Sequence, residues 1–127
     1  MSANGLRILK RDKEPVTKAE KKIALKAVLA ASDLIEQPLT WCQGAAAKNR
    51  HGLPTLPDGP DTCCWCMSGA IYRSAPSRTI RDIIGAVFFA LYGHRMHQWN
   101  DHQSRSHSGV LNALKRLADA ISNLKTA

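Results

Sequence analysis

The stretch IRDIIGAVFFALYGHRMHQWNDH, residues 80–102, decides the fold. Its first half places apolar residues at the i, i+3, i+4, i+7 spacing of a helix that faces a core. These residues are Ile80, Ile83, Ile84, Val87, Phe88 and Leu91. Its second half sets Trp99 beside Asn100 and Asp101, short side chains that suit turns and caps. We predict a long helix running into a structural anchor or a chemical site.

Local sequence signals mark the ends of three further helices. Thr17 and Glu20 form a capping box, so a helix should begin there and stop near Gln37, because Pro38 cannot continue it. We expect a short second helix from Asp61 or Thr62, with Cys66 on its apolar face. Ser77 should cap the helix of the deciding stretch, and Ser104 or Ser106 should cap a final amphipathic helix.

These elements predict an all-α fold. The 127 residues suit a single domain, and the sequence has neither internal repeats nor strong strand alternation. We expect a bundle or orthogonal array of about four helices in residues 17–127, preceded by a basic flexible arm, residues 1–16. The glycine- and proline-rich segment 39–61 should form a long irregular loop between the first two helices, with residues 52–59 as a mobile lobe or a short hairpin, and such loops are frequently functional.

The composition and the cysteine spacing indicate which cellular compartment and which cofactors to expect. No apolar run reaches the roughly 18 residues that a membrane span needs, and no secretory signal precedes the domain. We therefore expect a cytoplasmic protein that does not engage membranes and keeps its four cysteines reduced. Cys63, Cys64 and Cys66 could join nearby histidines at zinc, but their spacing matches no finger pattern. We expect no metal and no cofactor.

Basic residues concentrate at the start of the chain. The net charge is +8, and residues 1–26 hold eight of the 18 basic residues but three of the ten acidic ones. Positive charge of this kind speeds association with polyanions or acidic protein surfaces, although it also keeps a protein soluble. The predicted partner-binding residues are Arg7, Lys10, Arg11, Lys18, Lys21, Lys22 and Lys26.

Three short motifs could meet at one end of the domain. They are Trp41-Cys42-Gln43-Gly44, the segment Cys64-Trp65-Cys66-Met67-Ser68-Gly69-Ala70-Ile71, and Trp99-Asn100-Asp101. In this order they resemble a family of small uncharacterised bacterial and phage proteins with Trp-x-Gln-Gly, Cys-x-x-Gly-Ala and Trp-Asn-Asp motifs. The resemblance covers roughly residues 20–125. It implies a helical domain of phage or mobile-element origin, and no particular activity.

Two functions follow as expectations. The first is a non-enzymatic binding protein that meets a macromolecule, either an acidic protein surface or a nucleic acid, through its basic residues. The alternative is an enzyme or small-ligand module with a pocket between the motifs. That pocket would comprise Trp41, Gln43, Gly44, Cys66, Trp99, Asn100 and Asp101. The competing interpretation is that these residues satisfy the polar groups that helix ends leave unpaired.

Overall fold

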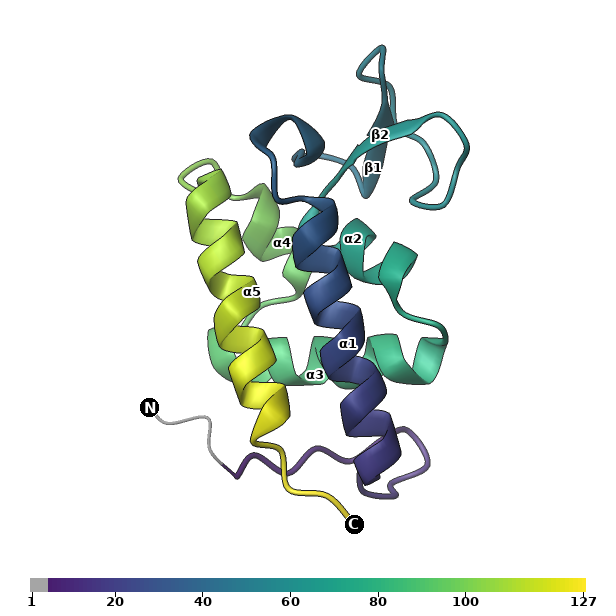
Figure 1. The fold of residues 1–127 in the computed structure, drawn as a ribbon. Coiled ribbons are helices and arrows are strands. Elements are labelled where there is room, and N and C mark those ends of the chain that lie inside the picture. Colours follow the sequence, from purple (N-terminus) through teal and green to yellow (C-terminus); the bar gives the residue numbers. More distant parts are fainter. Residues whose placement is uncertain (1–4) are drawn as a thin grey trace.

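The computed structural model describes residues 5–127, which form five α-helices, a short 3-10 helix and a two-stranded antiparallel sheet (Figure 1). The elements are α1 (Lys18–Leu34), η1 (Pro38–Thr40), β1 (Ala47–Asn49), β2 (Thr62–Trp65), α2 (Met67–Ser74), α3 (Arg78–Tyr92), α4 (Met96–Asp101) and α5 (His107–Ser122). The prediction of an all-α fold with about four helices was therefore wrong, because β1 in the expected irregular loop pairs with β2, which follows that loop. The chain is a small mixed domain of helices and one sheet.

Helix α1 begins at the predicted capping box. The Thr17 hydroxyl accepts a hydrogen bond from Glu20 N at 3.1 Å, and Thr17 N donates to Glu20 Oε1 at 3.0 Å. These two bonds satisfy amide groups that a helix start leaves unpaired. The helix ends at Leu34, before the predicted stop at Gln37, and its buried face consists largely of alanine. Small side chains on this face let neighbouring helices approach closely.

The deciding stretch forms two helices instead of one. The predicted apolar stripe is buried on α3 except for Leu91, which is partly buried, and Ser77 caps this helix by accepting a hydrogen bond from Ile80 N. Gly93 then adopts the left-handed conformation, with φ +71°, and its N–H donates to Phe89 O at 2.8 Å. Glycine takes this conformation at little cost, so it ends α3. Helix α4 then begins at Met96 and runs in a different direction from α3 (Figure 1).

Helix α5 closes the core. Ser106 caps it as predicted, by accepting a hydrogen bond from Gly109 N at 3.1 Å. In Figure 1, α5 lies beside α1 with the opposite chain direction, while α3 crosses behind the pair. The core residues that α5 contributes are Val110, Ala113, Leu114, Leu117, Ala118, Ala120 and Ile121.

The sheet replaces the start of the predicted second helix. Strands β1 and β2 pair antiparallel, with Ala47 opposite Trp65. Such a small sheet is marginal alone, but the Trp65 indole N–H donates to Pro57 O at 2.7 Å and Cys66 N donates to Ala46 O at 3.0 Å. Cys66 is consequently the N-cap of α2, where its Sγ accepts from Gly69 N at 3.3 Å. Its predicted place on the apolar face of a helix was wrong.

The segment before α1 packs against the ends of the helices. Leu6 O accepts a hydrogen bond from Lys125 N at 2.9 Å, and Val16 O accepts one from Ala127 N at 3.0 Å. The Val16 side chain is fully buried in the core. Residues 1–4 of the predicted arm lie outside the described residues. The flexibility of residues 1–16 stays a prediction.

Candidate functional site

Asn100 joins the three sequence motifs. It is fully buried, and its Oδ1 accepts hydrogen bonds from the Trp41 indole N–H at 2.7 Å and from Met67 N at 3.1 Å. Its Nδ2 donates to Cys42 O at 3.1 Å and to Asp101 Oδ1 at 3.0 Å. Met67 is the first residue of α2, so one bond satisfies an amide that has no partner within that helix. Asn100 therefore joins α4, α2 and the segment before β1.

Gln43 and Asp101 strengthen the same connection. Gln43 Nε2 donates to Asn100 O at 2.7 Å and to His102 O at 3.1 Å. Asp101 Oδ1 also accepts a hydrogen bond from Gly44 N at 3.0 Å. Gly44 has a φ of +86°, a conformation that favours glycine. The Trp-x-Gln-Gly segment is thus bound along the end of α4 by main-chain and amide contacts.

Trp99 fixes the other side of α4. Its ring packs edge-on against Phe88 at 5.7 Å between centroids and at a tilt against Tyr92 at 5.1 Å. The Arg105 guanidinium lies 3.9 Å from the indole ring centroid, and Arg105 Nε donates to Trp99 O at 2.8 Å. Aromatic and cation–π contacts of this kind stabilise a partly buried tryptophan beyond its area alone. The contacts attach α4 to the last turns of α3.

His107 is a member of this region that the sequence reasoning missed. Its ring lies 5.9 Å from that of Trp41, and its Nε2 is 2.7 Å from Ile35 O. A carbonyl oxygen accepts hydrogen bonds, so Nε2 carries the proton and donates. A single histidine at a helix start gives no sequence signal for this contact, because its partner lies 72 residues away.

The predicted pocket residues come together, but as a hydrogen-bonded scaffold. They do not line the groove between the N-terminal segment, α2 and α3, nor the smaller cavity between α1 and α5. The carboxylate oxygen of Asp101 that enters the cluster already accepts from two donors, Gly44 N and Asn100 Nδ2. The geometry supports a structural role, in which the motifs satisfy main-chain groups around the sheet and α4.

The thiols of Cys42 and Cys66 are poorly suited to nucleophilic chemistry. Burial raises the pKa of the Cys66 thiol, and burial together with the neighbouring Cys64 raises the pKa of Cys42 to about 12. A thiol with a raised pKa is protonated near neutral pH and attacks slowly. Within residues 5–127, no three histidine, cysteine or acidic side chains are arranged to hold a metal ion. The four cysteines are free thiols.

The predicted partner-binding residues divide into two groups. Lys10 Nζ lies 3.0 Å from Glu20 Oε1, Arg11 Nε lies 3.0 Å from Asp82 Oδ2, and Lys21 Nζ donates to Leu124 O at 3.2 Å. These three side chains therefore bind other parts of the domain. The remaining four are exposed and, within residues 5–127, form no ion pair. They are Arg7, Lys18, Lys22 and Lys26.

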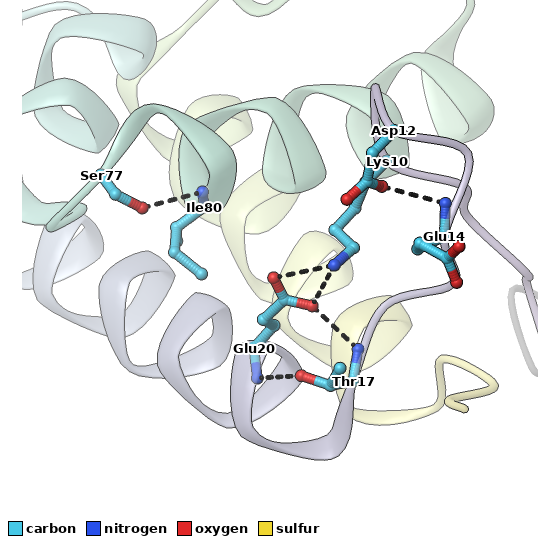
Figure 2. A network of polar contacts seen from close by, with 7 residues as sticks. All are labelled: Lys10, Asp12, Glu14, Thr17, Glu20, Ser77 and Ile80. Atoms are coloured by element: carbon cyan, nitrogen blue, oxygen red, sulfur yellow. Dashed lines mark hydrogen bonds and ion pairs between the residues drawn. The ribbon is translucent and has the colours of Figure 1, made fainter.

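Lys10 and Glu20 attach the N-terminal segment to α1. Figure 2 shows the Lys10 ammonium between both oxygens of the Glu20 carboxylate, which also accepts from Thr17 N. The Thr17 main-chain bond, together with Lys10, lowers the pKa of Glu20, and the Glu20 contact raises the pKa of Lys10. The ionised carboxylate therefore stabilises the fold.

We expect Glu20→Gln to flatten the acid limb of the stability profile. A carboxyl group with a lowered folded-state pKa stabilises the fold above its ordinary value of 4.5 and loses that contribution as the pH falls through the folded-state pKa. Glutamine does not titrate, so the variant should lose less free energy of unfolding between about pH 5 and about pH 3. Urea unfolding at stepped pH measures this, with the exposed Glu36→Gln as control. Equal slopes for Glu20→Gln and the wild type would contradict it.

The fold and the hydrogen-bonded cluster around Asn100 define a class of protein: a small mixed domain in which residues of the three motifs hold a short sheet against a helical core. The chain belongs to a family of unknown function (DUF6197), whose model matches residues 23–120. No curated protein and no solved structure matches the chain. None of the helices within residues 5–127 combines the length and the apolar character needed to cross a membrane.

Proposed function

We propose that this domain is a non-enzymatic binding protein that recognises an acidic surface of a partner protein through the exposed face of α1. Lys18, Lys22 and Lys26 recur every four residues, so they lie along one side of the helix. Because they form no ion pair within residues 5–127, a partner's carboxylates can approach them without displacing an internal contact. This row of free ammonium groups carries the proposal.

Two exposed apolar residues on the same helix as the lysines favour a protein partner over a nucleic acid. Ile23 is 42% exposed and Leu29 is 52% exposed on the same helix. Protein interfaces combine an apolar centre with polar surroundings, whereas non-specific nucleic-acid contact depends mainly on phosphate neutralisation. The phage or mobile-element origin implied by the motifs is part of this proposal, with a host protein as the partner.

The alternative of an enzyme or small-ligand module has less support. It requires free polar groups around a cavity, while both polar atoms of the Asn100 side chain and the Nε2 of Gln43 are bonded to the protein itself. One carboxylate oxygen of Asp101, Oδ1, is likewise engaged. We therefore assign these residues to the scaffold and place the interaction on α1.

Charge reversal on α1 tests the proposal. Partners captured from nuclease-treated host lysate are identified, purified and titrated against the wild type and Lys18→Glu/Lys22→Glu/Lys26→Glu. We expect at least about a tenfold loss of affinity in the variant and a marked weakening of wild-type binding as the salt concentration rises.

A second triple variant controls for net charge. Arg50→Glu/Arg73→Glu/Lys115→Glu reverses three exposed cations on other elements, and it should bind within about twofold of the wild type if position matters. Equal losses in the two triple variants would point to non-specific attraction and would remove the proposal. If a partner is captured from untreated lysate but not from nuclease-treated lysate, the partner is a nucleic acid instead.

A further inference from the structure

A groove of about 1060 Å³ lies between the N-terminal segment, α2 and α3. Three large apolar side chains line it while remaining open to solvent: Leu9 is 58% exposed, Tyr72 47% and Phe89 56%. The buried Ile71 and Ile83 also contribute to its lining. Exposed apolar side chains that gather in a concave surface are typical of interaction sites.

The charges around the groove leave two cations free. Each acidic residue of the lining already has an internal partner: Glu20 contacts Lys10, Asp82 contacts Arg11, and Asp12 Oδ1 accepts a hydrogen bond from Glu14 N at 2.9 Å. Arg81 and Arg95 also line the groove, and neither has a carboxylate partner within residues 5–127. The Arg81 guanidinium lies 4.4 Å from the Tyr72 ring centroid, which holds it in place. An occupant with carboxylates at its edges would complement these two groups.

Gly85 opens the side of the groove formed by α3. A glycine inside a helix is destabilising relative to alanine, so its presence is usually connected with close packing. The fold provides no such packing here, because a Cβ built on Gly85 would meet no atom within 4 Å. Phe89 lies one turn of α3 after Gly85, with Ala86 between them. The shallow main-chain surface at Gly85 and Ala86 therefore borders the large apolar side chain of Phe89. A helix could approach α3 closely at this point.

We propose that this groove binds an amphipathic helix of a partner protein, with its apolar side chains on Leu9, Tyr72 and Phe89 and its carboxylates on Arg81 and Arg95. Helix-in-groove recognition uses apolar anchors at i, i+3 or i+4, and i+7, and these fit a groove with an apolar lining and charged edges. A continuous phosphate backbone fits less well, because it has no apolar side chains to cover the exposed Leu9, Tyr72 and Phe89. The surface is distinct from the α1 face and does not depend on it.

A display library of random 16-residue peptides, selected on the wild-type domain, tests the proposal. We expect enrichment of peptides with apolar residues at helix spacing and with Asp or Glu beside them. The enriched peptide, labelled with fluorescein, is then titrated by fluorescence anisotropy, together with a copy in which lysine replaces each acidic residue. The lysine copy should bind at least about tenfold more weakly. No enrichment, or equal affinity of the two peptides, would overturn the proposal.

Variants of the domain locate the binding site. Gly85→Leu places a side chain in the groove and Arg81→Glu/Arg95→Glu reverses its free cations, so each should weaken the acidic peptide at least about tenfold. Lys18→Glu/Lys22→Glu/Lys26→Glu should bind the peptide within about threefold of the wild type, which separates this site from the α1 face. Circular dichroism and thermal unfolding establish that each variant is folded. Unchanged affinity in both groove variants would overturn the proposal.

Discussion

Replacing the fully buried Asn100 by alanine should destabilise the domain by more than about 3 kcal/mol, because one buried and two part-buried polar groups lose their partner at once. They are the Trp41 indole N–H, the Met67 main-chain N–H and the Cys42 carbonyl. Each such group costs about 1–3 kcal/mol when it stays buried without a hydrogen bond. Domains of this size are stable by about 5–15 kcal/mol, so the loss is a large part of the total.

Urea unfolding followed by circular dichroism and by tryptophan fluorescence measures this effect. Trp41 and Trp99 lie beside Asn100 in the structure or the sequence, so fluorescence also reports local loosening. Asn112→Ala is the matched control, since Asn112 is exposed on α5 and should change stability by less than about 0.5 kcal/mol. A value for Asn100→Ala within about 1 kcal/mol of the wild type would show that water replaces the amide and that the scaffold role is overstated.

The elements with local causes were predicted well. The caps at Thr17, Ser77 and Ser106 are confirmed, because a cap is formed by residues within one helical turn of each other. The buried stripe of α3 is confirmed for the same reason, since its period of about 3.6 residues is visible in the sequence. The sequence left open whether Gly93 marks a bend or a place of close packing, because glycine is also tolerated inside a helix and its left-handed conformation depends on where the chain must go next.

The strands could not be found from local pattern. They are three and four residues long, too short to show alternation. Their formation depends on a pairing between Ala47 and Trp65 and on main-chain contact with the start of α2. Cysteine and tryptophan in the second strand resemble a helix face as readily as a strand face. The prediction of an all-α domain failed at this point.

The sequence analysis named the residues of the candidate site but left their role open. The sequence shows that Trp41, Gln43, Asn100 and Asp101 can form hydrogen bonds, but the contacts between the two motifs join residues 57 to 59 positions apart. Whether such groups face a cavity or each other depends on packing. The basic residues gave a similar ambiguity, because the carboxylate that engages Arg11 lies on α3, far along the chain.

Two glycine-to-alanine substitutions should have opposite effects on stability. At Gly69, at the start of α2, an added Cβ would overlap the Ala46 carbonyl oxygen and lie 2.8 Å from its carbonyl carbon. That main chain cannot move away freely, because Ala46 O accepts the hydrogen bond from Cys66 N at 3.0 Å. Overpacking against fixed atoms costs about 1–3 kcal/mol and occasionally more, so we expect Gly69→Ala to lose about 3 kcal/mol or more.

Gly85→Ala is the matched substitution, in the middle of α3, where the added methyl group meets no atom within 4 Å. Alanine is favoured over glycine inside a helix, so this variant should gain about 0.5–1 kcal/mol. Urea and thermal unfolding of both variants measure the contrast. A loss in both would mean that α3 also packs closely at Gly85. A neutral Gly69→Ala would mean that the sheet can separate from α2, so that the contact between the Cys-x-x-Gly-Ala segment and Ala46 does not hold the sheet in place.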